Sequence, residues 1–194
     1  SQVFAEGEVR SSLSEGGNDT RIRSGSMQAD RKTGWVEYSE DPSIILGDNT
    51  IHGKTVRYNH PEQRLIVETD VVSTFSAGGS KQVRQYSIES DRFVYDRQDL
   101  RARYEGKVRL ETQDLILMAP FMDLTFSDTV SEKIQEIVAW GGVQIFQEDR
   151  TAEGDRAVHY PLQNKVVLTG DPAQVVELDS GRVAGRQLTF YLGD

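Results

Sequence analysis

Cysteine is absent from the 194 residues, which excludes disulfide bridges, thiolate nucleophiles and cysteine-zinc sites. No apolar run approaches the roughly 18 residues that span a bilayer as a helix. The first residues, Ser1 to Gly7, lack the charged and apolar regions of a signal peptide, so any export signal or membrane anchor is expected to lie outside this sequence. Lysine and arginine number 22 against 31 acidic residues, and no stretch concentrates them, which argues against nucleic acid as a partner.

The residues that are present follow the rhythm of an all-β protein. Short runs of Val, Ile, Leu, Tyr and Thr alternate with polar residues and are separated by Gly, Asp, Asn and Pro turns. With 37% apolar residues, the chain can bury a core and fold by itself. Ser131 to Trp140 has apolar residues at helical spacing, so a helix is the alternative there, although the repeat described next favours a strand.

One eight-position template recurs along the chain. It reads apolar, any, small, any, any, apolar, any, aromatic or apolar, and its copies start 29 to 37 residues apart, with a period near 32. The six copies begin at Ile22, Ile51, Ile88, Leu117, Ala152 and Val183. We therefore predict a protein built from about six tandem repeats, each a small meander of three short runs.

Two irregularities within the template predict how each strand bends. Residues that face inward are two apart along a strand, but in every copy the third and sixth template positions are three apart. One extra residue, a β-bulge at the same place in each copy, would explain this spacing. Gly106, Gly141 and Gly170 mark the joins between later runs and are expected at corners. The third template position is always small, as expected where two sheets pinch together, or alternatively where a turn is preferred; its residues are Ser24, Gly53, Ser90, Ala119, Gly154 and Gly185.

Three segments carry a family resemblance. They are Ala139 to Ile145, Asp149 to Val158 and Val166 to Ala173, and in this order and spacing they resemble the OstA-like family of lipopolysaccharide-transport proteins, with LptA-type and LptC-type members. The resemblance is strongest over 100–194 and looser through the earlier copies, so 1–194 is expected to form a single domain. Phe4 to Arg10 also matches Arg103 to Arg109, which predicts that the chain starts partway through a repeat.

The resemblance implies a fold, a ligand and partners. The fold is an antiparallel β-jellyroll, an open V-shaped sandwich of two sheets, which carries the lipid A acyl chains of lipopolysaccharide on its apolar inner face. Members lie in the periplasm of Gram-negative bacteria and stack end to end on other Lpt-type jellyroll proteins or on copies of themselves. The candidate edges here are Val3 to Arg10 and Gln187 to Leu192. The expected start partway through a repeat, the number of copies and the lack of an LptC-type anchor in this sequence leave open which family member the chain represents.

The inward template positions give the candidate lipid-binding residues. An acyl chain needs a continuous apolar strip, because burial of apolar surface contributes roughly 25 cal/mol per Å². The same residues could instead be the core of a closed sandwich. They are Ile22, Met27, Ile51, Val56, Tyr58, Ile88, Phe93, Tyr95, Leu117, Met122, Leu124, Val143, Ile145, Leu168, Leu188 and Phe190.

An enzyme finds little support in the sequence. The acidic residues fall in turns, where carboxylates ordinarily cap the backbone, and no pair suggests glycoside hydrolysis. His52, His60 and His159 lack the spacing of metal ligands, and His159 occupies a template position that is aromatic in other copies. We therefore expect no catalysis, metal or cofactor. The alternative to a lipid carrier is a structural domain of an outer-membrane assembly protein that binds protein and no lipid.

Overall fold

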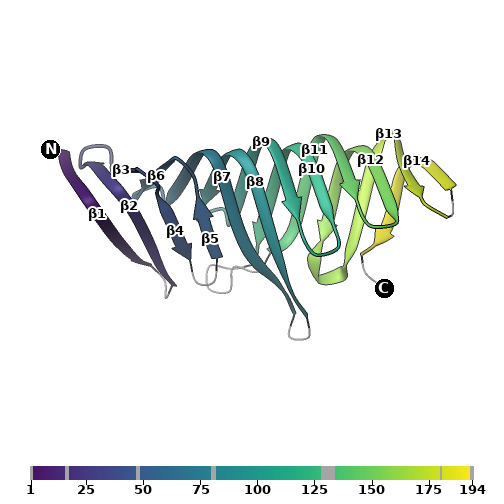
Figure 1. Cartoon of the computed structure of the whole chain (residues 1–194), viewed down its shortest axis with the longest axis horizontal. Coiled ribbons are helices and arrows are strands. Elements are labelled where there is room, and N and C mark those ends of the chain that lie inside the picture. Colours follow the sequence, from purple (N-terminus) through teal and green to yellow (C-terminus); the bar gives the residue numbers. More distant parts are fainter. Residues whose placement is uncertain are drawn as a thin grey trace.

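The computed structural model describes residues 2–15, 18–46, 49–79, 82–127, 134–179 and 181–192. Antiparallel strands make up nearly all of this part of the chain and form one continuous sheet (Figure 1). The elements are β1 (Gln2–Glu15), β2 (Asn18–Asp30), β3 (Trp35–Ser39), β4 (Ser43–Leu46), β5 (Asn49–His52), β6 (Thr55–Asn59), β7 (Arg64–Gly79), β8 (Gln82–Asp96), β9 (Arg101–Glu111), β10 (Ile116–Phe126), β11 (Ile134–Phe146), β12 (Arg150–Tyr160), the 3₁₀ turn η1 (Pro161–Gln163), β13 (Lys165–Glu177) and β14 (Gly181–Tyr191).

The sheet bends along one line, so that each long strand contributes to two layers. β2 pairs with β4 over one half of its length and with β3 over the other half. We call the layer that contains β4 and β5 layer A and the layer that contains β3 and β6 layer B. β3 with β4, and β5 with β6, act as two long strands that are interrupted at the bend, whereas β7 to β14 cross it unbroken (Figure 1). The predicted antiparallel jellyroll is confirmed.

A bulge occupies the bend, as the slip in the template predicts. The β8–β9 register shifts between Glu89 and Arg92, and the β12–β13 register between Glu153 and Arg156. Gly106 and Gly141 adopt positive φ at the bend, where residues other than glycine would be strained. The runs on either side of these glycines are therefore halves of one strand, so the predicted three-run meander is wrong. The count of six repeats stays a prediction, although the copies do fall on every second long strand.

The small residue of the template lies beside the bulge, and its size is required sterically at Gly53 and Gly154 but not at Gly185, where a Cβ atom would meet nothing closer than 3.7 Å. A Cβ atom on Gly154 would come within 2.8 Å of the Thr169 carbonyl oxygen, and one on Gly53 within 2.4 Å of Val67 Cγ1. In two other copies the small residue is a buried serine. The Ser24 hydroxyl donates a hydrogen bond to the Ser26 carbonyl, and the Ser90 hydroxyl donates one to the Arg92 carbonyl. Close packing at the bend is therefore confirmed for these copies, with the neighbouring strand as the contact.

The core lies between layers A and B. Phe75 of layer A faces Phe126 of layer B, with ring centroids 6.2 Å apart, and Tyr86 faces His159 at the same distance. His159 is fully buried, so its role is packing in the core. The segment from Ile134 to Trp140 is part of β11, so the helical alternative is wrong there, while 131–133 lie outside the described residues.

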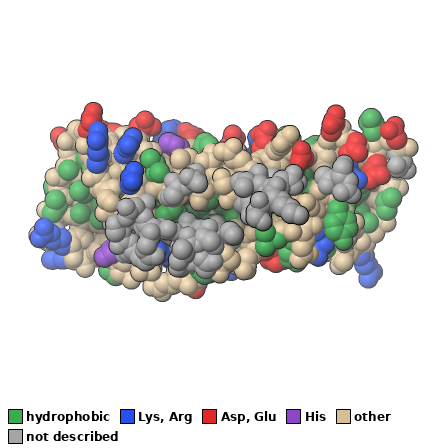
Figure 2. All heavy atoms as spheres, turned by 90° about the horizontal axis from the view of Figure 1, so that it is seen from below, with side chains coloured by type: hydrophobic (Ala, Val, Ile, Leu, Met, Phe, Trp, Pro, Cys, Tyr) green, Lys and Arg blue, Asp and Glu red, His purple; other side chains and the backbone are tan. Residues whose placement is uncertain are grey.

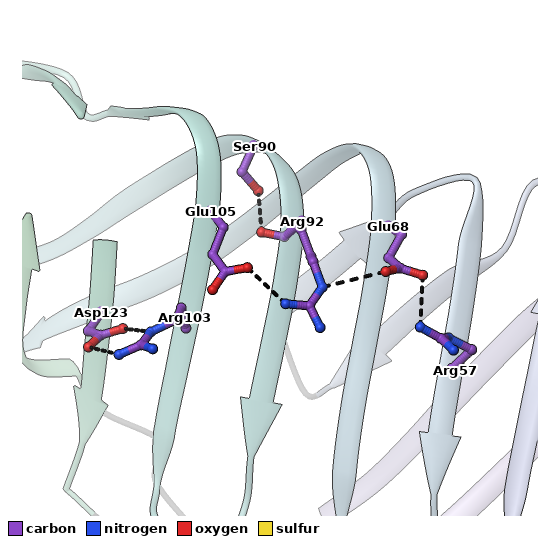
Figure 3. A network of polar contacts seen from close by, with 7 residues as sticks. All are labelled: Arg57, Glu68, Ser90, Arg92, Arg103, Glu105 and Asp123. Carbon is purple, nitrogen blue, oxygen red and sulfur yellow. Dashed lines mark hydrogen bonds and ion pairs between the residues drawn. The ribbon is translucent and has the colours of Figure 1, made fainter. Parts of the chain in front are cut away.

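Charged side chains tie the strands together on the outer face of layer B (Figure 3). Arg57 on β6 contacts Glu68 on β7 at 3.0 Å, and Glu68 also contacts Arg92 on β8 at 3.5 Å. Arg92 in turn contacts Glu105 on β9 at 2.8 Å. All four side chains are partly exposed, so each pair contributes little by itself. Because the charges alternate from strand to strand, a slip in register would separate these opposite charges.

Candidate functional site

The sixteen candidate lipid-binding residues all face the interior between the two layers. Twelve are buried, and the other four, Met27, Tyr58, Tyr95 and Leu188, are partly buried and pack against the core. Together with buried residues of the neighbouring strands, they form one continuous apolar interior, and their role in lipid binding stays a prediction. Most of this interior is filled by its own side chains, as in a closed sandwich, so the space available to a ligand depends on where the packing is incomplete.

The packing is incomplete in the N-terminal half, between the two layers. A cavity of about 50 Å³ lies there, lined almost entirely by apolar and aromatic side chains. Five of the candidates line it, namely Ile22, Ile51, Tyr58, Phe93 and Tyr95. Because a water molecule occupies roughly 30 Å³ of the liquid, an acyl chain could enter only if the layers moved apart.

Eight further residues line the cavity and were not among the candidates. Ile44, Leu65 and Phe75 lie on strands that pair with a template copy, at positions opposite or alternating with it, so extending the period-two pattern to those strands would have found them. Gln63 and Arg97 lie in turns, where no periodic signal exists. The full set of additional residues is Thr20, Ile44, Leu46, Gln63, Leu65, Phe75, Arg97 and Phe126.

A group of buried polar side chains closes the interior next to the cavity. Ser73 and Tyr86 of layer A and Tyr104 and His159 of layer B are completely buried. Burial raises the pKa of Tyr104, while the nearby Ser73 hydroxyl works in the opposite direction, so Tyr104 stays protonated at neutral pH. The turn η1 contacts both β7 and β11. The polar group interrupts the apolar lining locally, while the buried apolar residues around it still form one continuous cluster.

The C-terminal half has a different opening, with acidic walls. A hollow of about 960 Å³ lies between the turns that follow β9 and β11 and the end of β14. Its acidic residues are Glu111, Asp114, Glu148, Asp149 and Glu177. Its one basic residue, Arg150, is held by Glu177 at 2.8 Å and lies over the ring of Phe190. Acidic side chains gather toward the right-hand, C-terminal end in Figure 2, so this hollow repels anions.

The two ends of the sheet present strands that are paired on one side only. In the part of the chain that the structure describes, β1 pairs with β2 alone and β14 with β13 alone. Apolar side chains are exposed at both ends, with Phe4 64% exposed on β1 and Val183 and Tyr191 59% and 65% exposed on β14. Unpaired N–H and C=O groups beside exposed apolar side chains are the features of an edge that accepts another strand.

Neither a metal site nor a membrane-spanning helix is found in the described ranges. Among those residues, no group of three or more His, Asp or Glu side chains could hold a metal ion. No helix there is long and apolar enough to cross a membrane. His52, His60 and His159 lie on different strands and turns, and only His159 is in the core.

Comparisons with known proteins agree with the observed fold. The family described as "LptA/(LptD N-terminal domain) LPS transport protein" matches residues 87–193, just over half of the chain and nearly the segment where the resemblance is strongest. The crystal structure of LptH, the LptA-homologous periplasmic component of the lipopolysaccharide transport device of Pseudomonas aeruginosa, superimposes with a TM-score of 0.50. The superposition covers 59% of this chain and 86% of the LptH chain, with 13% sequence identity. At this identity the comparison shows a likeness of fold alone. No curated protein matches the sequence.

Proposed function

Because the chain belongs to the family of LptA-like and LptD N-terminal lipopolysaccharide-transport proteins, a transport family and not an enzyme family, we propose that it is a periplasmic carrier of lipopolysaccharide. In this proposal the lipid A acyl chains occupy the interior between layers A and B, and the protein pairs end to end with other jellyroll proteins of the transport system. The observation that carries the proposal is the continuous apolar interior with an apolar cavity in its N-terminal half.

The two-layer arrangement allows the interior to open without breaking the backbone hydrogen bonds of the sheet. Backbone hydrogen bonds run between neighbouring strands within each layer, whereas the layers face each other through side chains such as Phe75 and Phe126. Parting the layers therefore breaks no strand pairing. The apolar surface exposed by opening would be covered again by acyl chains, which recovers roughly 25 cal/mol per Å².

Charge favours the N-terminal cavity as the place where the lipid binds. Lipid A carries phosphates, and the cavity has one cation, Arg97, and no carboxylate among its lining residues. The C-terminal hollow is lined by five carboxylates and would repel a phosphorylated headgroup. A bound lipid is therefore expected to place its acyl chains among Phe75, Phe93 and Phe126, with its headgroup toward Arg97.

Lipid binding can be tested at two residues of the cavity wall that are not fully buried. Leu46 and Tyr95 line the cavity and are only partly buried. Leu46→Glu and Tyr95→Glu should each weaken lipopolysaccharide binding at least about tenfold, because a carboxylate placed in the acyl-chain site must be desolvated. Binding is measured by displacement of a fluorescent apolar dye on titration with lipopolysaccharide.

The matched control is Val72→Glu, which adds the same charge to the outer face of layer A, where Val72 is exposed. It should bind lipopolysaccharide like the parent protein. Saturable displacement by the parent and the control, with loss in both rim variants, supports the carrier. Absence of displacement from the parent protein would instead favour the alternative, a scaffold domain that binds protein without lipid.

End-to-end pairing has a register that the strand pairs of this protein define. The sixth residue of each template copy before β14 lies directly opposite an inward-facing residue on the strand that follows the copy. Three such pairs are Phe93–Tyr104, Met122–Ala139 and Ala157–Leu168. On β14 the sixth position is Leu188. On β1 the equivalent of Tyr104 is Ala5, because Tyr104 pairs with Met122 and Ala5 pairs with Met27. Leu188 of one copy should therefore lie opposite Ala5 of the next.

The charges at the bend suit this register. Asp91 lies against Gly106 in the β8–β9 pair, and the equivalent positions at the junction are Arg186 and Gly7. Gly7 is flanked by Glu6 and Glu8, so the arginine of β14 would meet two carboxylates on β1. The interior would also remain apolar across the junction.

A cysteine pair tests the junction, since the chain has no cysteine of its own. Mixed at high concentration and oxidised, Leu188→Cys and Ala5→Cys should form a disulfide-linked dimer, because directly opposed residues of antiparallel strands have Cα atoms about 4.5–5.5 Å apart, which a disulfide can span. The matched control is Gln187→Cys with Ala5→Cys, which places the thiols on opposite faces of the sheet. Non-reducing electrophoresis gives the yields, and equal yields from the two pairs would contradict the register.

A further inference from the structure

Charged residues that lie opposite each other on neighbouring strands have opposite signs in all but one pair of the described sheet. Eight pairs follow this pattern. These pairs are Glu37–Arg57, Arg64–Asp96, Glu68–Arg92, Glu89–Arg109, Arg92–Glu105, Asp96–Arg101, Asp123–Arg103 and Arg150–Glu177. The ninth pair, Arg10 on β1 opposite Arg23 on β2, places two cations together. Directly opposed like charges destabilise a sheet.

A third arginine joins this pair on the outer face of layer A. Arg21 lies two residues before Arg23, and the residue between them, Ile22, is buried in the core. Because side chains alternate along a strand, Arg21 and Arg23 both point outward, next to Arg10. The three arginines and Ser12 surround a hollow of about 270 Å³.

The positive charge of this cluster is poorly compensated within the protein. Arg10 contacts Glu8 at 3.2 Å, but both side chains are largely exposed, so the attraction is screened by solvent. Among the residues that the structure describes, no ion pair involves Arg21 or Arg23. On the side toward the bend, Arg10 and Arg23 also line a second hollow with Glu8, Glu40 and Asp41, so part of their charge is compensated there, whereas Arg21 does not line that hollow. Three cations gathered in a chain of net charge −9 are therefore a local feature and no consequence of overall composition.

We propose that Arg10, Arg21 and Arg23 form a binding site for a phosphate group. Guanidinium groups offer paired N–H donors that match phosphate oxygens, and a phosphate monoester carries enough negative charge to offset the repulsion between Arg10 and Arg23. The hydroxyl of Ser12 beside Arg21, and that of Ser43 opposite Arg23, are further donors at the edge of the cluster. The site lies outside the interior and does not depend on lipid carriage.

Inorganic phosphate tests the site directly. The melting temperature of the parent protein should rise with phosphate above the value in sodium chloride of equal ionic strength, because a ligand that binds the folded state stabilises it. The double variant R21Q/R23Q should bind phosphate at least about tenfold more weakly, since it loses two charged donors. In low-salt, phosphate-free buffer R23Q should melt above the parent protein, because the repulsion with Arg10 is gone.

The matched control is R109Q, which removes an arginine from the same face that is paired with Glu89. It should keep the response to phosphate. An equal rise with phosphate and chloride in the parent protein, or an unchanged response in R21Q/R23Q, would overturn the site.

Vesicles distinguish the source of the phosphate. Sedimentation with phosphatidic acid vesicles, and none with phosphatidylcholine vesicles, would assign the site to a lipid headgroup, provided that R21Q/R23Q stays in the supernatant. Binding of inorganic phosphate without vesicle binding would assign it to a soluble phosphate compound. The cavity variant Leu46→Glu should keep either response, so failure of lipopolysaccharide binding and failure of this site remain separate results.

Discussion

Replacing Phe93 by aspartate should unfold the protein. Phe93 is 1% exposed, lies in layer B and packs against Tyr104 with ring centroids 4.9 Å apart. Removing a buried phenylalanine costs about 3–5 kcal/mol, and an unpaired carboxylate in the same place adds a desolvation penalty. The sum is comparable to the whole stability of a typical domain, about 5–15 kcal/mol. Circular dichroism at 25 °C should show loss of β structure.

The matched control is Phe121→Asp, the same change on the outer face. Phe121 is 40% exposed and stacks on Trp140 with centroids 5.7 Å apart. The aspartate remains in water there, so the expected loss is that of the aromatic contact, about 1 kcal/mol. A folded Phe93→Asp variant would mean that the layers separate easily around this residue, and the interior would then be an open groove in the free protein.

Periodicity predicted the inward-facing residues because one physical rule sets them. A strand with one buried face must place apolar side chains at every second position, so the positions of Ile88, Phe93 and Tyr95 could be derived from the sequence. The slip within the template predicted the bulge for the same reason, since Ile88 and Phe93 can face one interior only if an extra residue lies between them.

The number of strands per repeat could not be derived in the same way. A glycine at a bulge and a glycine at a hairpin turn look alike in one sequence, because both relieve the same steric restriction. Gly106 was therefore assigned to a join between two short runs, whereas the structure places it inside β9, which continues from Arg101 to Glu111.

The cavity and the arginine cluster depend on contacts between distant segments. Thr20 and Phe126 line one cavity although more than 100 residues separate them. Arg10 and Arg23 lie opposite each other only because β1 and β2 pair in a particular register. The composition argued against nucleic acid as a partner and gave no sign of a smaller anion-binding site, because the arginine cluster is formed only when β1 and β2 pair.

Replacing Asp123 by alanine should destabilise the protein by about 2 kcal/mol. Asp123 is 3% exposed and accepts hydrogen bonds from Arg103 at 2.8 and 3.0 Å (Figure 3). It also accepts a hydrogen bond from Arg101. The hydrogen bond to Asp123 raises the pKa of Arg103, and without the carboxylate two guanidinium groups would be left next to each other. Charged hydrogen bonds contribute about 1.5–3 kcal/mol each, and this contribution is reduced here because the arginines are half exposed.

Urea unfolding measures the loss of stability, with Lys54→Ala as the control. That variant breaks an exposed ion pair with Asp70 and should cost less than about 0.5 kcal/mol. Equal losses in the two variants would show that the burial of Asp123 adds nothing to its ion pairs.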